Sequence, residues 1–248
     1  MRLEYLTDVW SAANRFASRV RRAFADAVRH RNGAGSQPRK SGGRRAFLVG
    51  VACLGLCAAG SVWAAGTADI DQPLRRLYAA LDDVMKSGRQ TPFPRRFDML
   101  APVVDQVFDL ETVLKMSVGA RWDSINPDTR AHLLQVYRRF TVATYVANFD
   151  RYEGERFRIL PGSRDAGQDR IVGTEIISGS GDRQRLDYLM RDENGTWRVI
   201  DILLDGSISR VAVQRSDFRK ILASGDADTL IDNLRRKISD LSDGTLSS

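Results

Sequence analysis

The chain has 248 residues and a formal net charge of +7, but the charge is unevenly distributed. Residues 1–64 carry 11 Lys and Arg against three Asp and Glu, whereas residues 65–248 carry 27 against 28. The basic excess lies in the N-terminal part, which argues against nucleic-acid binding by the remainder. Both cysteines, Cys53 and Cys57, also precede residue 65. A chain cut there would have no disulfide, thiolate metal site or cysteine nucleophile.

Residues 44–64 have the order of a secretory signal peptide: a charged start, an apolar run and a small-residue exit. Arg44 and Arg45 precede the apolar run, which spans residues 46–60. This run is too short for a transmembrane helix, which needs about 20 apolar residues. Cleavage is predicted after Ala64. The arginine pair also resembles a twin-arginine export signal, although ordinary export signals carry arginines too.

Residues 1–43 form a basic extension ahead of this signal. Its apolar residues recur at helical spacing, with arginines between them: Leu6, Val9, Ala13, Phe16, Val20, Phe24 and Ala27. One interpretation is a basic helix that lies on an anionic membrane before export. The other is that the true start codon lies downstream and the segment is seldom made.

Residues 65–248 are predicted to form one α+β domain that begins with helices. Helices are expected over residues 71–88, 94–108 and 110–119, the last of them capped by Asp109. A long central helix should then run from Pro127 to about residue 149. Asn126 suits its N-cap, because the side chain can accept a hydrogen bond from an unpaired helix N–H. Its buried face is predicted from apolar spacings of three and four: Leu133, Val136, Tyr137, Phe140, Thr144 and Tyr145.

From residue 155 the apolar period changes from about 3.6 to 2, which predicts strands. Four are expected, at about residues 155–160, 171–177, 185–191 and 197–204, with a turn at 161–163 and a hairpin at Asn194–Gly195. Such short connections imply an antiparallel meander sheet. Two C-terminal helices follow, the second over about residues 227–241. We expect any cavity to lie between this sheet and the long helix.

Several segments together resemble the MlaC (toluene-tolerance) family of periplasmic lipid-binding proteins. They are residues 119–122 (Gly-Ala-Arg-Trp), the long helix with Phe140 and Tyr145, 152–154 (Tyr-Glu-Gly), 204–209 (Leu-Asp-Gly-Ser-Ile-Ser), Phe218 and 228–234. Residues 206–210 and 214–218 are closer to its HpnM branch, which is associated with hopanoid synthesis. The resemblance covers about residues 70–240 and lies in the order and spacing of the segments.

The resemblance implies a soluble periplasmic carrier without catalytic groups or cofactors. Its cargo would be a phospholipid or a hopanoid-type lipid. Its partners would be an ABC transporter complex of the inner membrane and a lipoprotein complex of the outer membrane. Such a carrier needs an apolar cleft, because each buried CH₂ contributes about 0.8 kcal/mol.

Eleven apolar and aromatic side chains of the long helix and the predicted strand faces are candidates for lining that cleft: Tyr137, Phe140, Tyr145, Phe157, Ile159, Ile176, Leu186, Tyr188, Met190, Ile200 and Ile202. The alternative for each of them is that it simply fills the core.

Two other classes of function stay open. Asp187 and Asp201 lie on neighbouring predicted strands and could form a catalytic carboxylate pair. Our preferred interpretation is that both face solvent opposite arginines such as Arg185 and Arg198. His132 is the one histidine after residue 64 and therefore the one candidate for a Ser-His-Asp triad, but we interpret it as a partly exposed helix residue. The third class is an envelope adaptor protein without cargo.

Overall fold

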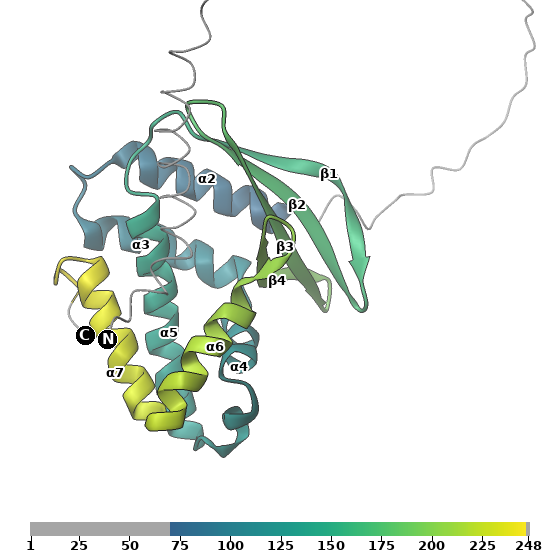
Figure 1. Cartoon of the computed structure of the whole chain (residues 1–248). Helices are drawn as coiled ribbons and strands as arrows, with labels where there is room; N and C mark the ends of the chain where they lie inside the picture. The colour runs from purple at the N-terminus through teal and green to yellow at the C-terminus, as the bar shows by residue number, and fades with distance from the viewer. Residues whose placement is uncertain (1–69, 247–248) are drawn as a thin grey trace, which may run out of the picture.

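The computed structural model describes residues 70–246. The predicted extension, signal peptide and cleavage site after Ala64 lie outside these residues. Helices and an antiparallel sheet make up the described part, as predicted, and the helices all pack on one side of the sheet (Figure 1). No helix within residues 70–246 combines the length and apolar character needed to cross a membrane.

The helical part begins with α2 (Gln72–Ser87), α3 (Phe93–Val107), α4 (Leu110–Val118) and the 3-10 helix η1 (Gly119–Ser124). Local chemistry sets their ends. Asp109 caps α4, because its carboxylate accepts a hydrogen bond from the Thr112 N–H at 2.9 Å. Gly88 ends α2 with a φ of 64°, a conformation that costs glycine little. The predicted cap at Asp109 is confirmed.

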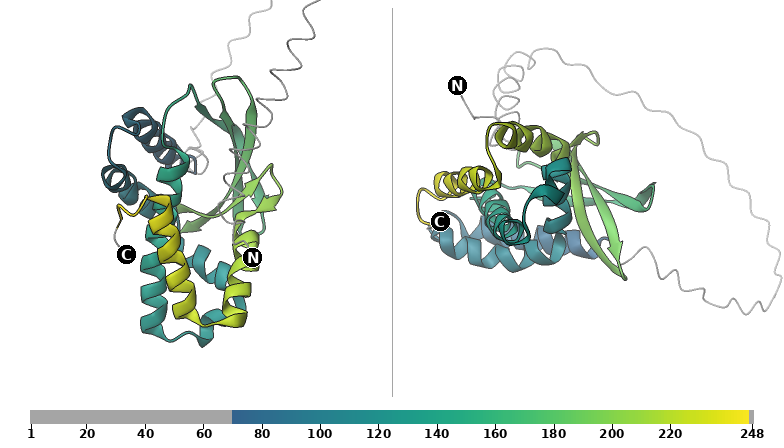
Figure 2. Two further views of the ribbon diagram at one scale, coloured as in Figure 1. Left: turned by 60° about the vertical axis from the view of Figure 1, so that its left-hand side comes forward. Right: turned by 90° about the horizontal axis from the view of Figure 1, so that it is seen from below.

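The long helix α5 (Pro127–Asn148) runs through the centre of the helical layer (Figure 2). Its predicted N-cap is confirmed, since the Asn126 side chain accepts a hydrogen bond from the Thr129 N–H at 2.8 Å. The single buried face that was predicted describes only the first half. Residues 140–146 are all buried, because α3, α4 and α7 pack around α5.

The sheet has five antiparallel strands in sequence order: β1 (Arg156–Ala166), β2 (Asp169–Ile177), β3 (Arg183–Glu193), β4 (Thr196–Leu204) and β5 (Ile208–Ser209). Four strands were predicted. The fifth has two residues, too few to show a period. The predicted turn at residues 161–163 is wrong, because β1 continues beyond it and its pairing with β2 is interrupted only between Ile159 and Ser163. β1 is an edge strand, where Pro161 can lie without a ladder partner.

A bulge in β4 changes which side chains face the helices. Tyr188 pairs with Ile202, but Met190 pairs with Val199, so Ile200 is the extra residue on β4. The bulge interrupts the regular alternation between Ile200 and Ile202, and Val199, paired with the buried Met190, belongs to the hydrophobic core.

The chain ends with α6 (Arg210–Ser224) and α7 (Ala227–Leu241), close to the two helices predicted. Ser209 caps α6 and Asp226 caps α7, each by accepting a hydrogen bond at 2.9 Å from the N–H three residues on. α7 packs along α5, while α6 starts directly from β5 and ties the sheet to the helices (Figure 2).

Candidate functional site

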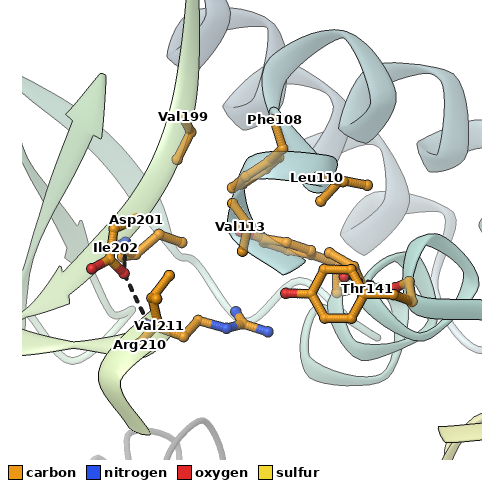
Figure 3. Close-up of a pocket in the computed structure, with 11 residues that line it drawn as sticks. Phe108, Leu110, Val113, Thr141, Val199, Asp201, Ile202, Arg210 and Val211 are labelled. Carbon is orange, nitrogen blue, oxygen red and sulfur yellow. Dashed lines mark hydrogen bonds between the residues drawn. The ribbon is translucent and has the colours of Figure 1, made fainter. Parts of the chain in front are cut away.

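A small cavity lies between β4, α5 and the start of α6 (Figure 3). Its volume is about 20 Å³, enough for one water molecule and far too small for an acyl chain. Eleven side chains line it: Phe108, Leu110, Val113, Tyr137, Thr141, Tyr145, Val199, Asp201, Ile202, Arg210 and Val211. The expectation of a lipid-sized hollow at this place is wrong for this conformation, because the interior is packed.

Polar groups lie next to this cavity, in the interface between the sheet and the helices. The Tyr137 hydroxyl donates a hydrogen bond to Gln214 Oε1 at 2.9 Å, and the Ser117 hydroxyl reaches the same oxygen at 3.2 Å. Burial raises the pKa of Tyr137 and of Tyr145, and the positive charge of Arg210 acts in the opposite direction. Arg210 extends from the start of α6 toward Thr141 on α5 (Figure 3). The neutral phenols of Tyr137 and Tyr145 therefore lie near the guanidinium group of Arg210 in this interface.

A larger groove opens between α2 and β1, with a volume of about 480 Å³. This lies within the range of about 300–1,000 Å³ that is typical of ligand pockets. Five of its lining residues are aromatic, aliphatic or proline, and two are charged: Asp71, Arg75, Tyr78, Phe157, Ile159, Leu160 and Pro161.

Tyr78 and Phe157 form the aromatic floor of the groove. Their rings stack with centroids 4.5 Å apart and an interplanar angle of 10°. The Tyr78 hydroxyl points inward and donates a hydrogen bond to Thr174 Oγ1 at 2.6 Å. The polar tip of Tyr78 is thus satisfied inside the domain, and its largely buried ring lines the groove.

The predicted lining residues divide between the cavity, the groove and the core. Tyr137, Tyr145 and Ile202 line the cavity, and Phe157 and Ile159 line the groove. The other six belong to neither: Phe140, Leu186, Tyr188, Met190 and Ile200 are buried, and Ile176 is half-buried against the core. As lipid contacts, all eleven stay predictions.

Sequence reasoning missed five of the seven residues that line the groove. Leu160 and Pro161 were overlooked because the Pro-Gly pair reads as a turn, although the strand continues through it. Asp71 and Arg75 have the pattern of an ordinary charged first helical turn, and nothing in the sequence shows that β1 passes beside them. Tyr78 recurs at helical spacing with other apolar residues of α2, which indicates a buried helix face but does not distinguish the groove floor from the core.

Asp187, one member of the candidate catalytic pair, lies on the outer face of the sheet beneath two arginines. It is 1% exposed, so its predicted solvent-facing position is wrong. Its carboxylate pairs with Arg164 and with Arg185, whose Nε lies 2.8 Å from Oδ1. Gly206 lies beside this carboxylate with a φ of 73°, a backbone conformation that favours glycine. The predicted pairing with Arg185 is confirmed.

Asp201 has different partners, at the start of α6. Its Oδ1 accepts a hydrogen bond from the Val211 N–H at 3.0 Å, and its Oδ2 accepts one from the Ser209 hydroxyl. Asp187 therefore pairs with arginines on the sheet, whereas Asp201 binds the start of α6. The two residues form no carboxylate pair. His132 also has a structural contact, with its Nε2 2.9 Å from Nη2 of Arg235 across the α5–α7 interface.

Replacing Arg185 with methionine should lower the free energy of unfolding by about 1.5–3 kcal/mol, because the buried Asp187 carboxylate loses a charged hydrogen-bond donor. A urea titration measures this loss. Arg183→Met is the matched control: Arg183 lies on the same strand and face, but it is 59% exposed and 3.6 Å from its partner Glu175. It should cost at most about 1 kcal/mol. In an Asp187→Asn background the cost of Arg185→Met should shrink, and an unchanged cost would show that the two residues are not coupled.

Within residues 70–246, no group of three or more His, Cys, Asp and Glu side chains is placed to hold a metal ion. The architecture is a helical layer packed on one face of an antiparallel sheet, with a groove between α2 and β1 that is lined by both apolar and charged side chains. The family model for the MlaC protein matches residues 75–236. The chain belongs to the MlaC family.

A solved structure shares this fold. It is a phospholipid-binding protein from Ralstonia solanacearum in complex with a phospholipid, with a TM-score of 0.60 and 17% sequence identity. The match covers 71% of this chain and 99% of that chain. At this identity the likeness shows the fold alone. No curated protein matches the sequence.

Proposed function

We propose that this protein is a periplasmic lipid-binding shuttle. Membership of the MlaC family and the fold shared with a phospholipid-bound protein support this proposal. The observation that carries it is the groove between α2 and β1, whose floor of Tyr78, Phe157 and Ile159 is apolar and whose volume suits a ligand. Its cargo is a phospholipid or, as the resemblance to the HpnM branch implies, a hopanoid-type lipid.

The packed interior is compatible with such a role on energetic grounds. An empty apolar hollow costs about 24 cal/mol per Å³, so one of roughly 400 Å³ would cost on the order of 10 kcal/mol. That equals the whole stability of a typical domain. A carrier is therefore expected to close over itself and to separate its sheet from its helices only around a lipid. Each CH₂ that enters then contributes about 0.8 kcal/mol toward the opening.

The remaining parts of the proposal concern export and partners. Residues 44–64 direct export, by the general or the twin-arginine route, and are removed after Ala64. The intact mass of the exported chain tests this cut. The shuttle works between an ABC transporter complex of the inner membrane and a lipoprotein complex of the outer membrane, as the family resemblance implies. Cross-linking in cells to components of those two complexes tests the partnership.

Ile159→Glu should remove at least about nine-tenths of the lipid that co-purifies with the protein, because a carboxylate in the apolar groove must be desolvated when an acyl chain enters. Native mass spectrometry of protein purified without detergent measures the loaded fraction. Ile177→Glu is the matched control, since Ile177 is also a half-buried isoleucine, but on β2 and facing the opposite side of the sheet. It should keep the wild-type loading.

Two results would contradict the proposal. Wild-type protein free of lipid in these spectra would favour an envelope adaptor without cargo. Equal loss of lipid in both variants would show that the groove is not the lipid site. Circular dichroism of each variant confirms that the comparison is between folded proteins.

A further inference from the structure

The charged rim of the groove contains one group of each sign. Asp71 and Arg75 are its two charged residues, one helical turn apart at the start of α2. Arg75 Nη1 lies 3.7 Å from Asp71 Oδ2, and their side chains are 54% and 28% exposed. The rim therefore presents a guanidinium and a carboxylate side by side, directly above the apolar floor.

The Asp71–Arg75 ion pair can separate at little cost, so that each of the two groups can bind a ligand instead. Exposed pairs at such a separation contribute little to stability, because water screens them and two long side chains must be held in place. A guanidinium is well suited to a phosphate, to which it can donate two parallel hydrogen bonds. A carboxylate beside it attracts an ammonium group and repels a second negative charge. The rim is thus complementary to a ligand that carries a phosphate and an amine together.

We propose that the groove selects a zwitterionic phospholipid headgroup, with Arg75 binding the phosphate and Asp71 binding the ammonium group. This inference rests on the proposed function and adds to it the chemical class of the cargo. The acyl chains lie along Tyr78, Phe157 and Ile159, and the headgroup stays at the solvent-facing rim. An anionic headgroup without an amine would meet the negative charge of Asp71 and gain no compensating contact.

The test is a competition between two headgroups. Protein freed of lipid is incubated with vesicles of equimolar phosphatidylethanolamine and phosphatidylglycerol that carry identical acyl chains. Native mass spectrometry then counts each lipid in the protein. Wild type should hold about two- to five-fold more phosphatidylethanolamine than phosphatidylglycerol, the factor expected of one exposed charge contact. Asp71→Asn should bring this ratio close to one, and Arg75→Gln should lower the loading of both lipids.

Matched controls lie on the same helix. Arg76→Gln and Asp83→Asn make the same chemical changes at exposed positions of α2 that do not line the groove, so both should keep the wild-type ratio. A wild-type ratio of one, or an Asp71→Asn ratio equal to that of wild type, would overturn the headgroup assignment while the loading itself upholds the carrier function. If wild type loads neither lipid, a phospholipid cargo is excluded and the headgroup assignment fails with it.

Discussion

Raising the pH above about 10 should lower the free energy of unfolding of this protein steeply. Four tyrosines are buried in the interface between the sheet and the helices: Tyr78, Tyr137, Tyr145 and Tyr188. Burial raises the pKa of each, because the phenolate would lose its hydration. In the unfolded chain the same side chains titrate near pH 10. Above that pH the unfolded state releases protons that the folded state retains.

The sign and size of this effect follow from proton linkage. The stabilisation is fully present below the unfolded pKa and is lost as pH rises toward the folded pKa values. Each tyrosine lowers the free energy of unfolding by about 1.4 kcal/mol per pH unit in that window, and four together by about 5 kcal/mol per unit. Urea titrations at several pH values between 9 and 11 measure the slope.

Tyr78→Phe removes one of the four titrating groups, so it should reduce the slope by about a quarter. The variant also loses the hydrogen bond to Thr174, which should cost about 1 kcal/mol at every pH, so the slope and not the absolute stability is the readout. A Tyr78→Phe slope equal to that of wild type would show that Tyr78 titrates freely in the folded protein.

Structural features that depend on residues close together in the sequence could be predicted. The caps at Asp109 and Asn126 and the hairpin at Asn194–Gly195 depend on groups within a few residues, and the structure has all three. The α+β order followed from the change of apolar period, which reflects burial of one face of each element. The family resemblance depended on the same local segments in their order along the chain.

Features set by pairs distant in the sequence were not predictable. The bulge at Ile200 depends on the register of β4 against β3, and the burial of Asp187 depends on Arg164, which reaches it from β1. The groove is of the same kind, because it exists only where β1 passes beside the first turns of α2. Its charged rim reads in sequence as a solvated helix face. The part of the site that would decide cargo choice was therefore the part least visible in the sequence.

Trp122→Ala should lower the free energy of unfolding by about 3–5 kcal/mol, the usual cost of deleting a buried aromatic side chain. Trp122 lies in η1, where α4 turns into the long helix, and is 6% exposed. The Arg130 guanidinium lies 5.7 Å from the centre of its ring and covers its outer side. Loss of the indole would leave a cavity at the joint that sets the direction of α5.

A urea titration measures this loss, and Trp197→Ala is the matched control. Trp197 is the other tryptophan of the described residues and is only half-buried on β4, so its removal should cost less. Because Trp122 lines neither the groove nor the cavity, folded Trp122→Ala protein should load lipid as wild type does. That combination identifies a packing residue. A loss below about 1 kcal/mol would place Trp122 outside the core, and lost loading in folded protein would place it at the lipid.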